Sequence, residues 1–408
     1  MKNEQNAPKI RFKGFTDAWE QRKLKELASF AKGSGYSKTD IKAEGTPIIL
    51  YGRLYTKYET TINDVDTFAE AKKGSIYSKG SEVIVPASGE TAEDIARASF
   101  VSKPGILLGG DLNIIYPNSA IEPTFLALSI SNGEQQKSLA KKAQGKSVVH
   151  LHNSDLETVQ ITYPTREEQR QIGTYFRTLD RLITLHQRKC ETLQKLKKSM
   201  LQKMFPKNGS CFPEIRFAGF TDAWEQRKLD ELVKFYSGLT YKPEDVTENG
   251  TLVLRSSNVK NSEIVLTDNV YVDESVVNSD NVKKDDIIVV VRNGSKALIG
   301  KHAKIRHSMP NTVIGAFMTG LRSDSPDFIN ALLSTEMFDK EIKMNMGATI
   351  NQITGYMFAN MEFMTPSFQE RQAVGSFFSR LDDLITLHQR KLETLKKLKK
   401  AMLQKMFI

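Results

Sequence analysis

The sequence repeats itself, and the closest repeat is a long lysine-rich segment. Residues Leu179–Phe205 read LDRLITLHQRKCETLQKLKKSMLQKMF, and Leu381–Phe407 read LDDLITLHQRKLETLKKLKKAMLQKMF, so only four positions differ. Neither copy contains Gly or Pro, and both are rich in Leu, Lys, Gln and Glu, which favour an α-helix. A duplication this close predicts a chain built from two related units.

A second repeat marks the start of each unit. Residues Ile10–Leu24 read IRFKGFTDAWEQRKL, and Ile215–Leu229 read IRFAGFTDAWEQRKL, with a single difference. The two units therefore follow each other with a period of about 203 residues. The segment that joins them, PKNGSCFP at Pro206–Pro213, has the Pro, Gly and Ser content of a linker.

Apolar residues recur at spacings of three and four along both repeated helices, which predicts coiled-coil packing. His186 and Lys189, with His388 and Lys391 in the copy, are expected to interrupt this seam and to fix its register at some cost in stability. Further apolar residues widen the surface, so we expect a second partner to cover it. They are Ile183, Leu185, Leu201 and Met204, with Ile385, Leu387, Leu403 and Met406 in the copy. The residues predicted to form the seam or to contact another subunit are Leu179, Leu182, Leu193, Leu196, Met200, Leu381, Leu384, Leu395, Leu398 and Met402.

The net charge of +10 is concentrated in the two helices. Thr165–Phe205 has ten Lys and Arg residues against four acids, and Ser367–Ile408 has nine against four, so the rest of the chain is close to neutral. A helix over Thr165–Phe205 would be a basic rod about 60 Å long. Such a rod attracts a polyanion or an acidic protein surface. The alternative is a lysine-rich helix face that is simply solvated.

Length and composition predict a soluble globular protein of two or more domains, because 408 residues exceed one ordinary core. The first residues, MKNEQNAPKIRF, lack the apolar centre of a signal peptide, and no stretch of 18 apolar residues is present. Cys190 and Cys211 are the two cysteines, which supports neither a disulfide framework nor a zinc site. We therefore expect a cytoplasmic protein.

Each unit has a divergent middle segment, Lys25–Pro164 in the first and Asp230–Pro366 in the second, which we call its body. Short β-type runs separated by polar turns predict strands in both bodies. They lie at Pro47–Tyr51, Ser81–Val85, Thr251–Leu254 and Asp286–Val291. A helix is expected later in each body, near Pro123–Ala143 and near Pro326–Met346. The predicted fold class is α+β.

The turns after these strands carry small polar residues together with Arg, Lys, Asn, Gln and Tyr, which are the groups that contact phosphates and base edges. The competing interpretation is that polar residues fill the loops of any protein. The residues predicted to bind DNA are Lys32, Ser34, Tyr36, Lys38, Arg53, Ser88, Lys146, Ser147, Thr240, Tyr241, Arg255, Ser257, Asn258, Arg292, Asn293, Ser295, Asn351 and Gln352.

Motifs for catalysis are weak or missing. Gln144–Ser147 contains GKS, but Ala140 stands where a phosphate-binding loop needs its first Gly. Asp327, Glu341 and Lys343 can be read as a nuclease set that would hold Mg²⁺, although their segment fits an amphipathic helix better. His150 and His152 have no neighbouring Cys or carboxylate cluster for a metal. We therefore predict no catalytic, metal or cofactor site in this chain.

The two units, their FxGFTDAWEQRKL starts and the Pro-x-x-x-Glu-Gln/Arg openings of the long helices resemble the specificity (S, HsdS) subunit of type I restriction–modification enzymes. These openings lie at Pro164/Glu168/Gln169 and Pro366/Glu370/Arg371, and the resemblance covers essentially the whole chain. It implies that each body reads one half of a split site in double-stranded DNA. It also implies that the long helices pair antiparallel, set the half-site spacing and dock two methyltransferase (M) subunits. By the same resemblance, S-adenosylmethionine belongs to the M subunits, and ATP and Mg²⁺ belong to restriction (R) subunits.

The predicted architecture is two tandem target-recognition domains joined by two long antiparallel coiled-coil helices with pseudo-two-fold symmetry. The expected divisions are residues 1–164 and 215–366 for the recognition domains, 165–205 and 367–408 for the helices, and 206–214 for the linker. The predicted function is non-catalytic DNA recognition. Two alternatives stay open: a coiled-coil scaffold that binds only proteins, and a stand-alone nuclease.

Overall fold

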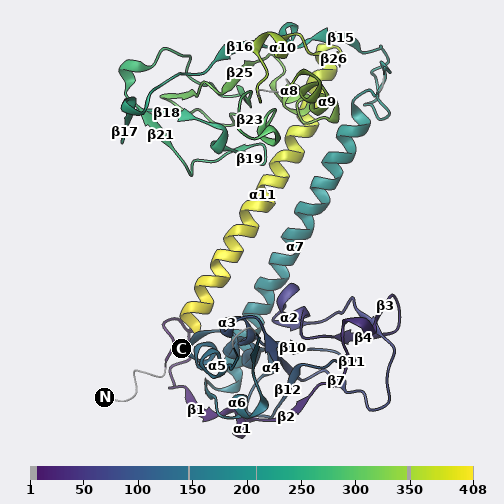
Figure 1. Ribbon diagram of the computed structural model, residues 1–408, viewed down its shortest axis with the longest axis vertical. Coiled ribbons are helices and arrows are strands. Elements are labelled where there is room, and N and C mark those ends of the chain that lie inside the picture. The colour runs from purple at the N-terminus through teal and green to yellow at the C-terminus, as the bar shows by residue number, and fades with distance from the viewer. Residues whose placement is uncertain (1–6, 146–147, 208, 347–350, 408) are drawn as a thin grey trace. The chain divides into compact units, whose positions relative to one another are not determined.

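The computed structural model describes residues 7–145, 148–207, 209–346 and 351–407 (Figure 1). The chain separates into two compact units, one made of residues 1–187 and 390–408 and the other of residues 188–389. We call them unit 1 and unit 2. Each unit contains one globular body, the first part of the long helix that follows this body, and the last part of the other long helix.

The body of unit 1 is built on two mixed sheets. In the first, the strand order is β2 (Ala28–Lys32), β12 (Leu112–Pro117), β8 (Val83–Pro86), β10 (Ser99–Val101) and β5 (Thr61–Ile62). In the second, it is β3 (Ile41–Lys42), β6 (Phe68–Ala69), β4 (Thr46–Ile49), β11 (Pro104–Leu108) and β7 (Tyr77–Lys79). Two short pairs complete the strands: β1 (Glu20–Lys23) with β14 (Gln160–Tyr163), and β9 (Ser88–Gly89) with β13 (Val149–His150).

Helices cover and connect these sheets. Those of the body are α1 (Leu24–Leu27), α2 (Arg53–Thr56), α3 (Ala92–Ile95), α4 (Pro123–Ile130), α5 (Gly133–Lys142) and α6 (Asn153–Glu157), with a 3₁₀ turn at η1 (Lys38–Asp40). Strand β8 is buried along its whole length, which explains its continuous apolar run VIVP. Val83 and Val85 join the side chains of α4 in the main core of the unit, and Ile84 packs in a second cluster on the other face of the strand.

The body of unit 2 repeats this plan with fewer strands in each sheet. One sheet has the order β16 (Lys234–Ser237), β25 (Met318–Arg322), β22 (Ile287–Val290) and β23 (His302–Lys304). The other has the order β17 (Val246–Thr247), β21 (Val270–Val272), β18 (Thr251–Leu254) and β24 (Thr312–Ile314). The short pairs are β15 (Glu225–Lys228) with β26 (Glu362–Thr365), and β19 (Val259–Lys260) with β20 (Glu263–Ile264).

The helices of this body are α8 (Pro326–Leu332), α9 (Glu336–Asn345) and α10 (Gly355–Ala359). Its 3₁₀ turns are η2 (Leu229–Glu231), η3 (Pro243–Asp245), η4 (Ser256–Asn258), η5 (Glu274–Val276) and η6 (Lys296–Leu298). The predicted strand at Thr251–Leu254 is confirmed, and the other three predicted strands are confirmed within two residues at their ends. The α+β class is therefore correct for both bodies.

Each helix predicted within a body is instead two helices. In unit 1, α4 ends where the hydroxyl of Ser131 donates to the carbonyl of Ala127 over 2.8 Å, and Gly133 follows with a positive φ of 66°. In unit 2, the hydroxyl of Thr335 accepts from the backbone N–H of Phe338 and caps α9. Side-chain hydrogen bonds of Ser and Thr to the backbone ended these helices earlier than the apolar pattern predicted.

A buried ion pair joins the repeated start of each unit to the opening of its long helix. The guanidinium of Arg11 donates to both carboxylate oxygens of Glu168, over 2.9 and 2.6 Å, and also to the carbonyl of Asp17. Arg216 holds Glu370 in unit 2 with two bonds of 2.7 Å. Both glutamate side chains are 1% exposed. The duplicated start of each unit therefore fastens its body to the beginning of a long helix.

The end of the other long helix enters the same joint. In unit 1, the ring of Phe407 lies 5.6 Å from the ring of Phe125 and 6.0 Å from that of Phe176. Figure 1 shows the C-terminal end of the chain beside this body. In unit 2, Phe205 lies 5.6 Å from Phe328 and 6.0 Å from Phe378. These aromatic contacts explain why the repeat extends to the last phenylalanine of each helix.

The long helices α7 (Arg166–Met204) and α11 (Phe368–Met406) run antiparallel within each unit. In unit 1, Phe176 of α7 contacts Phe407, which follows the end of α11. Asp180 lies further along α7, and it pairs with Lys399, which lies earlier in the chain than Phe407. In unit 2, Lys197 pairs with Asp382 over 2.6 Å.

Among the described residues, no helix combines the length and the apolar character that crossing a bilayer requires.

The seam between these helices follows a strict alternation of steps of four and three. In α7 the positions 179, 183, 186, 190, 193, 197, 200 and 204 are all buried or half-buried, and in α11 so are 381, 385, 388, 392, 395, 399, 402 and 406, with further half-buried residues such as Asp180 and Leu201 beside this line. The predicted seam residues Leu179, Leu193 and Met200 lie on this line, as do their copies Leu381, Leu395 and Met402.

The seam prediction is corrected at its other positions. Leu182 and Leu196 are exposed, with exposed fractions of 37% and 39%, and so are their copies Leu384 and Leu398. Lys189 and Lys391 are also exposed, and Cys190 and Leu392 take the seam positions beside them. Part of the heptad was hidden in the sequence because it passes through Lys197 and Lys399, which apolar spacing does not mark.

Lysines can occupy this seam because each has a carboxylate partner. The side chains of Lys197 and Asp382 are 15% and 14% exposed, and those of Lys399 and Asp180 are 20% and 33% exposed. A partly buried pair of this kind adds little net stability, but it penalises any register that separates the two charges. The polar interruption of the seam therefore consists of this Lys–Asp pair in each unit and of His186 and His388, which lie on the seam as predicted, whereas Lys189 and Lys391 lie outside it.

Candidate nucleic-acid interface

In unit 2 the predicted loops meet at one edge of the body. The turn after β16 is held by the N–H of Leu239, which donates to the carbonyl of Ile314 over 2.7 Å. The next residue, Gly315, donates to Leu254 at the end of β18, where the second loop begins. A Cβ on Gly238 would lie 2.1 Å from the carbonyl oxygen of Gly315, so this approach requires glycine.

The other two loops of unit 2 join the same cluster. The side-chain amide of Asn293 donates to the hydroxyl of Ser256 over 3.0 Å, and that of Asn351 donates to the carbonyl of Gly294 over 2.9 Å. Arg292 and Gln352 form an antiparallel bridge. Four segments that are far apart in the sequence therefore present one continuous polar surface.

Unit 1 brings its loops together in the same way. Gly33 donates to Leu112 and would clash with the carbonyl of Gly109 if it carried a Cβ, as in unit 2. The hydroxyl of Tyr55, which follows the Tyr51–Arg53 turn, donates to the carbonyl of Ser88 over 2.8 Å. His150 pairs with Ser88 between β13 and β9. The common frame shows that the two bodies are divergent copies.

Some predicted DNA-binding residues hold the loops themselves. Arg53 is bound by Glu59 and Asp66, over 2.8 and 2.6 Å, and its side chain is only 8% exposed. Arg255 donates to Asp268 over 2.7 Å. A guanidinium that is already paired with carboxylates loses that interaction if it turns toward a phosphate or a base. These ion pairs favour a structural role for both arginines, and DNA binding by either stays a prediction.

Tyr36 and Asn258 are also corrected, because both are buried. Tyr36 is 6% exposed, and its hydroxyl accepts from the N–H of Lys72. Asn258 is fully buried and accepts from the N–H of Arg255, so it closes the 3₁₀ turn η4. Their polar atoms satisfy the backbone of the loop, which the sequence alone cannot distinguish from contact with a ligand.

The remaining predicted residues fall into three groups. Exposed in the structure are Lys32, Lys38, Thr240, Arg292 and Ser295. The second group is less accessible: Ser88 is buried, and the half-buried residues are Ser34, Tyr241, Ser257, Asn293, Asn351 and Gln352. Lys146 and Ser147 lie outside the described residues.

Three residues of the cluster were missed by sequence reasoning. Phe317 is 51% exposed, and the guanidinium carbon of Arg292 lies 5.0 Å above the centre of its ring. Asp111 and His150 of unit 1 are exposed as well, and Asp111 has a positive φ of 57°. The sequence signal that could have found these turns is a glycine shortly before each of them. Gly315 lies two residues before Phe317, and Gly109 and Gly110 lie directly before Asp111. Only the structure aligns these turns with the loops around them.

The sequence matches the family described as type I restriction modification DNA specificity domain twice, over residues 16–195 and 221–397. These two matches cover most of the chain. The chain belongs to this family. It is a type I restriction–modification specificity subunit with two target-recognition domains, as the duplicated sequence indicated.

Similar proteins agree with this assignment. The specificity subunit is 25% identical over 399 residues to the type I restriction enzyme MjaVIII specificity subunit of Methanocaldococcus jannaschii, covering 94% of this chain and 91% of that protein. It is 23% identical over 424 residues to the putative MjaX specificity subunit of the same organism, covering 98% and 95%. The crystal structure of a type I S subunit from M. genitalium has the same fold, with a TM-score of 0.69 at 17% identity, covering 98% and 99% of the two chains.

The residues of the nuclease alternative have structural partners in the specificity subunit. Asp327 forms an ion pair with Lys304, and Glu341 accepts from the side chain of Asn345 in the same helix over 3.3 Å. In the described part of the chain, no group of three His, Cys, Asp or Glu side chains is arranged to hold a metal. The geometry therefore adds no support to a nuclease site here.

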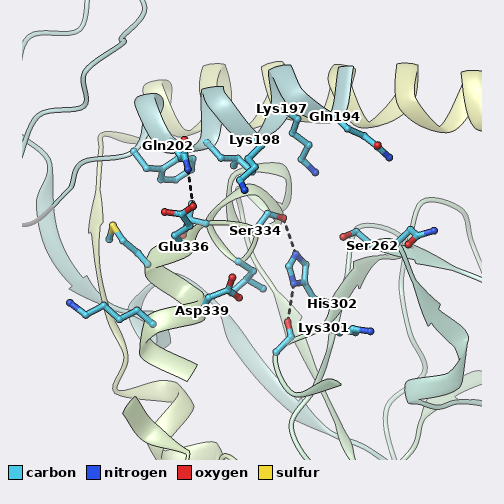
Figure 2. Close-up of a pocket in the computed structure, with 18 of the residues that line it drawn as sticks. Gln194, Lys197, Lys198, Gln202, Ser262, Lys301, His302, Ser334, Glu336 and Asp339 are labelled. Carbon is cyan, nitrogen blue, oxygen red and sulfur yellow. Dashed lines mark hydrogen bonds between the residues drawn. The ribbon is translucent and has the colours of Figure 1, made fainter. Parts of the chain in front are cut away.

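Unit 2 of the specificity subunit also contains a cavity of about 990 Å³. It lies between the second part of α7, the β19–β20 hairpin and the α8–α9 junction. Figure 2 shows His302 on its wall, bonded to Ser334 and facing Lys197 and Lys198 of α7. In unit 1, Tyr58 bonds instead to Ser131, which has the position of Ser334 at the end of the preceding helix. The two bodies therefore differ behind their loop clusters as well as in them.

We expect acid to destabilise unit 2 through His302. Burial lowers the pKa of His302 from its ordinary 6.5, and Lys197 lowers it further, whereas Asp382 opposes this. The unfolded chain then binds a proton before the folded chain does, so stability present at neutral pH is lost as the pH falls below 6.5. The free energy of unfolding of unit 2 should fall by up to about 1.4 kcal/mol per pH unit more in the wild type than in His302→Gln.

The measurement is urea unfolding of the whole chain between pH 7 and pH 5. His307, which is exposed, supplies the control, because His307→Gln should leave the slope unchanged. Equal pH slopes for the wild type and His302→Gln would contradict this account.

Proposed function

We propose that the chain is a non-catalytic reader of DNA, and that each body recognises one half of a bipartite site. The observation that supports this most directly is the loop cluster of each body. Both clusters have the same backbone frame, and they carry different side chains at its surface. A common frame with exchanged side chains suits two readers of unlike half-sites.

The long helices would hold these readers at a fixed distance. We propose that α7 and α11 pair antiparallel with pseudo-two-fold symmetry, so that the two recognition bodies face half-sites about one DNA turn, roughly 34 Å, or somewhat more apart. The predicted recognition domains, residues 1–164 and 215–366, correspond to these bodies.

The same helices would dock two methyltransferase subunits. Their exposed leucines leave apolar surface beside the seam, which the pair of helices does not cover. These residues are Leu182, Leu185, Leu196, Leu384, Leu387 and Leu398. The partners would supply S-adenosylmethionine, and restriction subunits would supply the ATP- and Mg²⁺-dependent steps. We place this assembly in the cytoplasm, with the DNA that it reads.

Sequencing of adenine methylation tests this function. Cells that carry this gene with its M partner should methylate one split motif, and deletion of this gene alone should remove that motif completely. Methylation that is unchanged by the deletion would overturn the proposal. Expression of the deleted gene from a plasmid should restore the motif, which controls for an effect on the M partner.

A further inference from the structure

Three surface positions occupy equivalent places in the two loop clusters. In unit 1, Ala87 donates to the carbonyl of Asp111 over 2.7 Å and accepts from Leu151 over 3.0 Å. In unit 2, Val291 donates to Phe317 over 3.0 Å and accepts from Ile353 over 2.9 Å. The registers of the strands also agree, since Leu112 pairs with Pro86 and Met318 pairs with Val290.

This equivalence pairs each loop residue of unit 1 with one loop residue of unit 2. Ser88 corresponds to Arg292, Asp111 to Phe317, and His150 to Gln352. Ser88 pairs with His150 just as Arg292 pairs with Gln352. The backbone thus holds three side chains in one place in both bodies, and the chemistry of these side chains is almost opposite. Unit 1 presents a carboxylate at this place, whereas unit 2 presents a guanidinium on an aromatic ring.

The pair in unit 2 has the properties of a base-reading group. The guanidinium of Arg292 is stacked 5.0 Å from the ring centre of Phe317, which leaves its N–H edge free to donate. Among the described residues Arg292 forms no ion pair, unlike Arg53 and Arg255. Stacking also restricts the side chain without neutralising it, so little conformational entropy is lost when it binds.

We propose that Arg292 reads a guanine in the half-site of unit 2, and that Phe317 contacts the pyrimidine next to it. A planar fork of donors matches the O6 and N7 acceptors of guanine in the major groove, and an exposed ring suits the methyl group of thymine. This inference rests on the proposed function and deepens it by naming one base and the residues that select it. Unit 1 has Asp111 at the position of Phe317, so it should lack this preference.

The test is the methylation motif of variant chains expressed with the M partner. The wild-type motif should contain a guanine at one fixed position of one half-site. Arg292→Ala should raise methylation of sites with another base at that position by roughly 10- to 100-fold relative to the guanine site, and should leave the other half-site unchanged. Lys296→Ala is the control, because this exposed lysine of η6 lies close by and should affect all sequences equally.

Arg292→Gln keeps the inference testable if the alanine variant is inactive. A glutamine can pair with the N6 and N7 groups of adenine, so the guanine of the motif should become adenine. A motif that keeps its guanine in Arg292→Gln overturns the inference. A complex of this variant that melts like the wild type and methylates no site overturns it as well. If the wild-type chain itself directs no motif, the proposed function fails, and this outcome is recognisable before any variant is compared.

Discussion

Replacing the body of unit 1 by that of unit 2 is expected to give a methylation motif with two copies of one half-site. The exchange would put residues 230–361 in place of residues 25–159. These limits leave β1, β14 and the Arg11–Glu168 pair in place, and β14 pairs with β1 from Gln160 onward. The graft also keeps the aromatic joint, because Phe328 has the place of Phe125 against the end of a long helix.

We expect this result because, in each unit, the loop side chains proposed to contact DNA and the contacts that attach the body to the helices lie in different parts of the sequence. Loop side chains such as Arg292 and Phe317 lie within the exchanged segment, whereas the repeated segments that attach the body lie outside it. The DNA-recognition loops of unit 1 should therefore be replaced completely, while the long helices stay the same. The measurement is the methylation motif of the chimera with its M partner. A protein scaffold without DNA recognition would leave the motif as it was, so an unchanged motif excludes the reading function of unit 1.

Arg11→Ala is expected to lower the free energy of unfolding of unit 1 by about 3–5 kcal/mol. The substitution leaves the carboxylate of Glu168 buried, 1% exposed, and without its two guanidinium bonds. An unpaired charge in that position is costly, because it has lost both its water and its partner. Arg216→Ala should do the same to unit 2, where Glu370 is equally buried.

Chemical unfolding followed by circular dichroism measures this loss. Arg22→Ala is the matched control, because Arg22 and Glu20 form an exposed pair in the same repeated segment and should contribute about 0–1 kcal/mol. The double change of Arg11 to Met and Glu168 to Leu should recover much of the stability, since no buried charge is then left alone. A loss in Arg11→Ala no larger than that in Arg22→Ala would contradict the assignment of this pair as the fastening between body and helix.

The contacts between body and helices explain which structural features could be predicted from the sequence. Arg11 and Trp19 belong to the repeated start and Glu168 to the shared opening of the long helices, because the same contacts are made twice, and a repeat is visible without a structure. The strands were predictable for a similar reason, since buried runs such as Val83–Pro86 are continuous and apolar. The helices of the bodies were predicted as single elements, because side-chain caps such as that of Thr335 weigh little in a periodic apolar pattern.

The sequence by itself determined the duplication, the long helices, the α+β class of the bodies and the family. The first three depend on the repetition or the local periodicity of side chains, and the family depends on the resemblance of motifs such as the FxGFTDAWEQRKL starts to known members. The tertiary structure decided which face of each helix forms the seam, because Lys197 and Lys399 occupy seam positions that apolar spacing does not reveal. It also decided which polar loop residues are available to a ligand. Arg53 and Arg292 look alike in the sequence, but only the folded chain shows that Glu59 and Asp66 hold Arg53, whereas the ring of Phe317 supports Arg292.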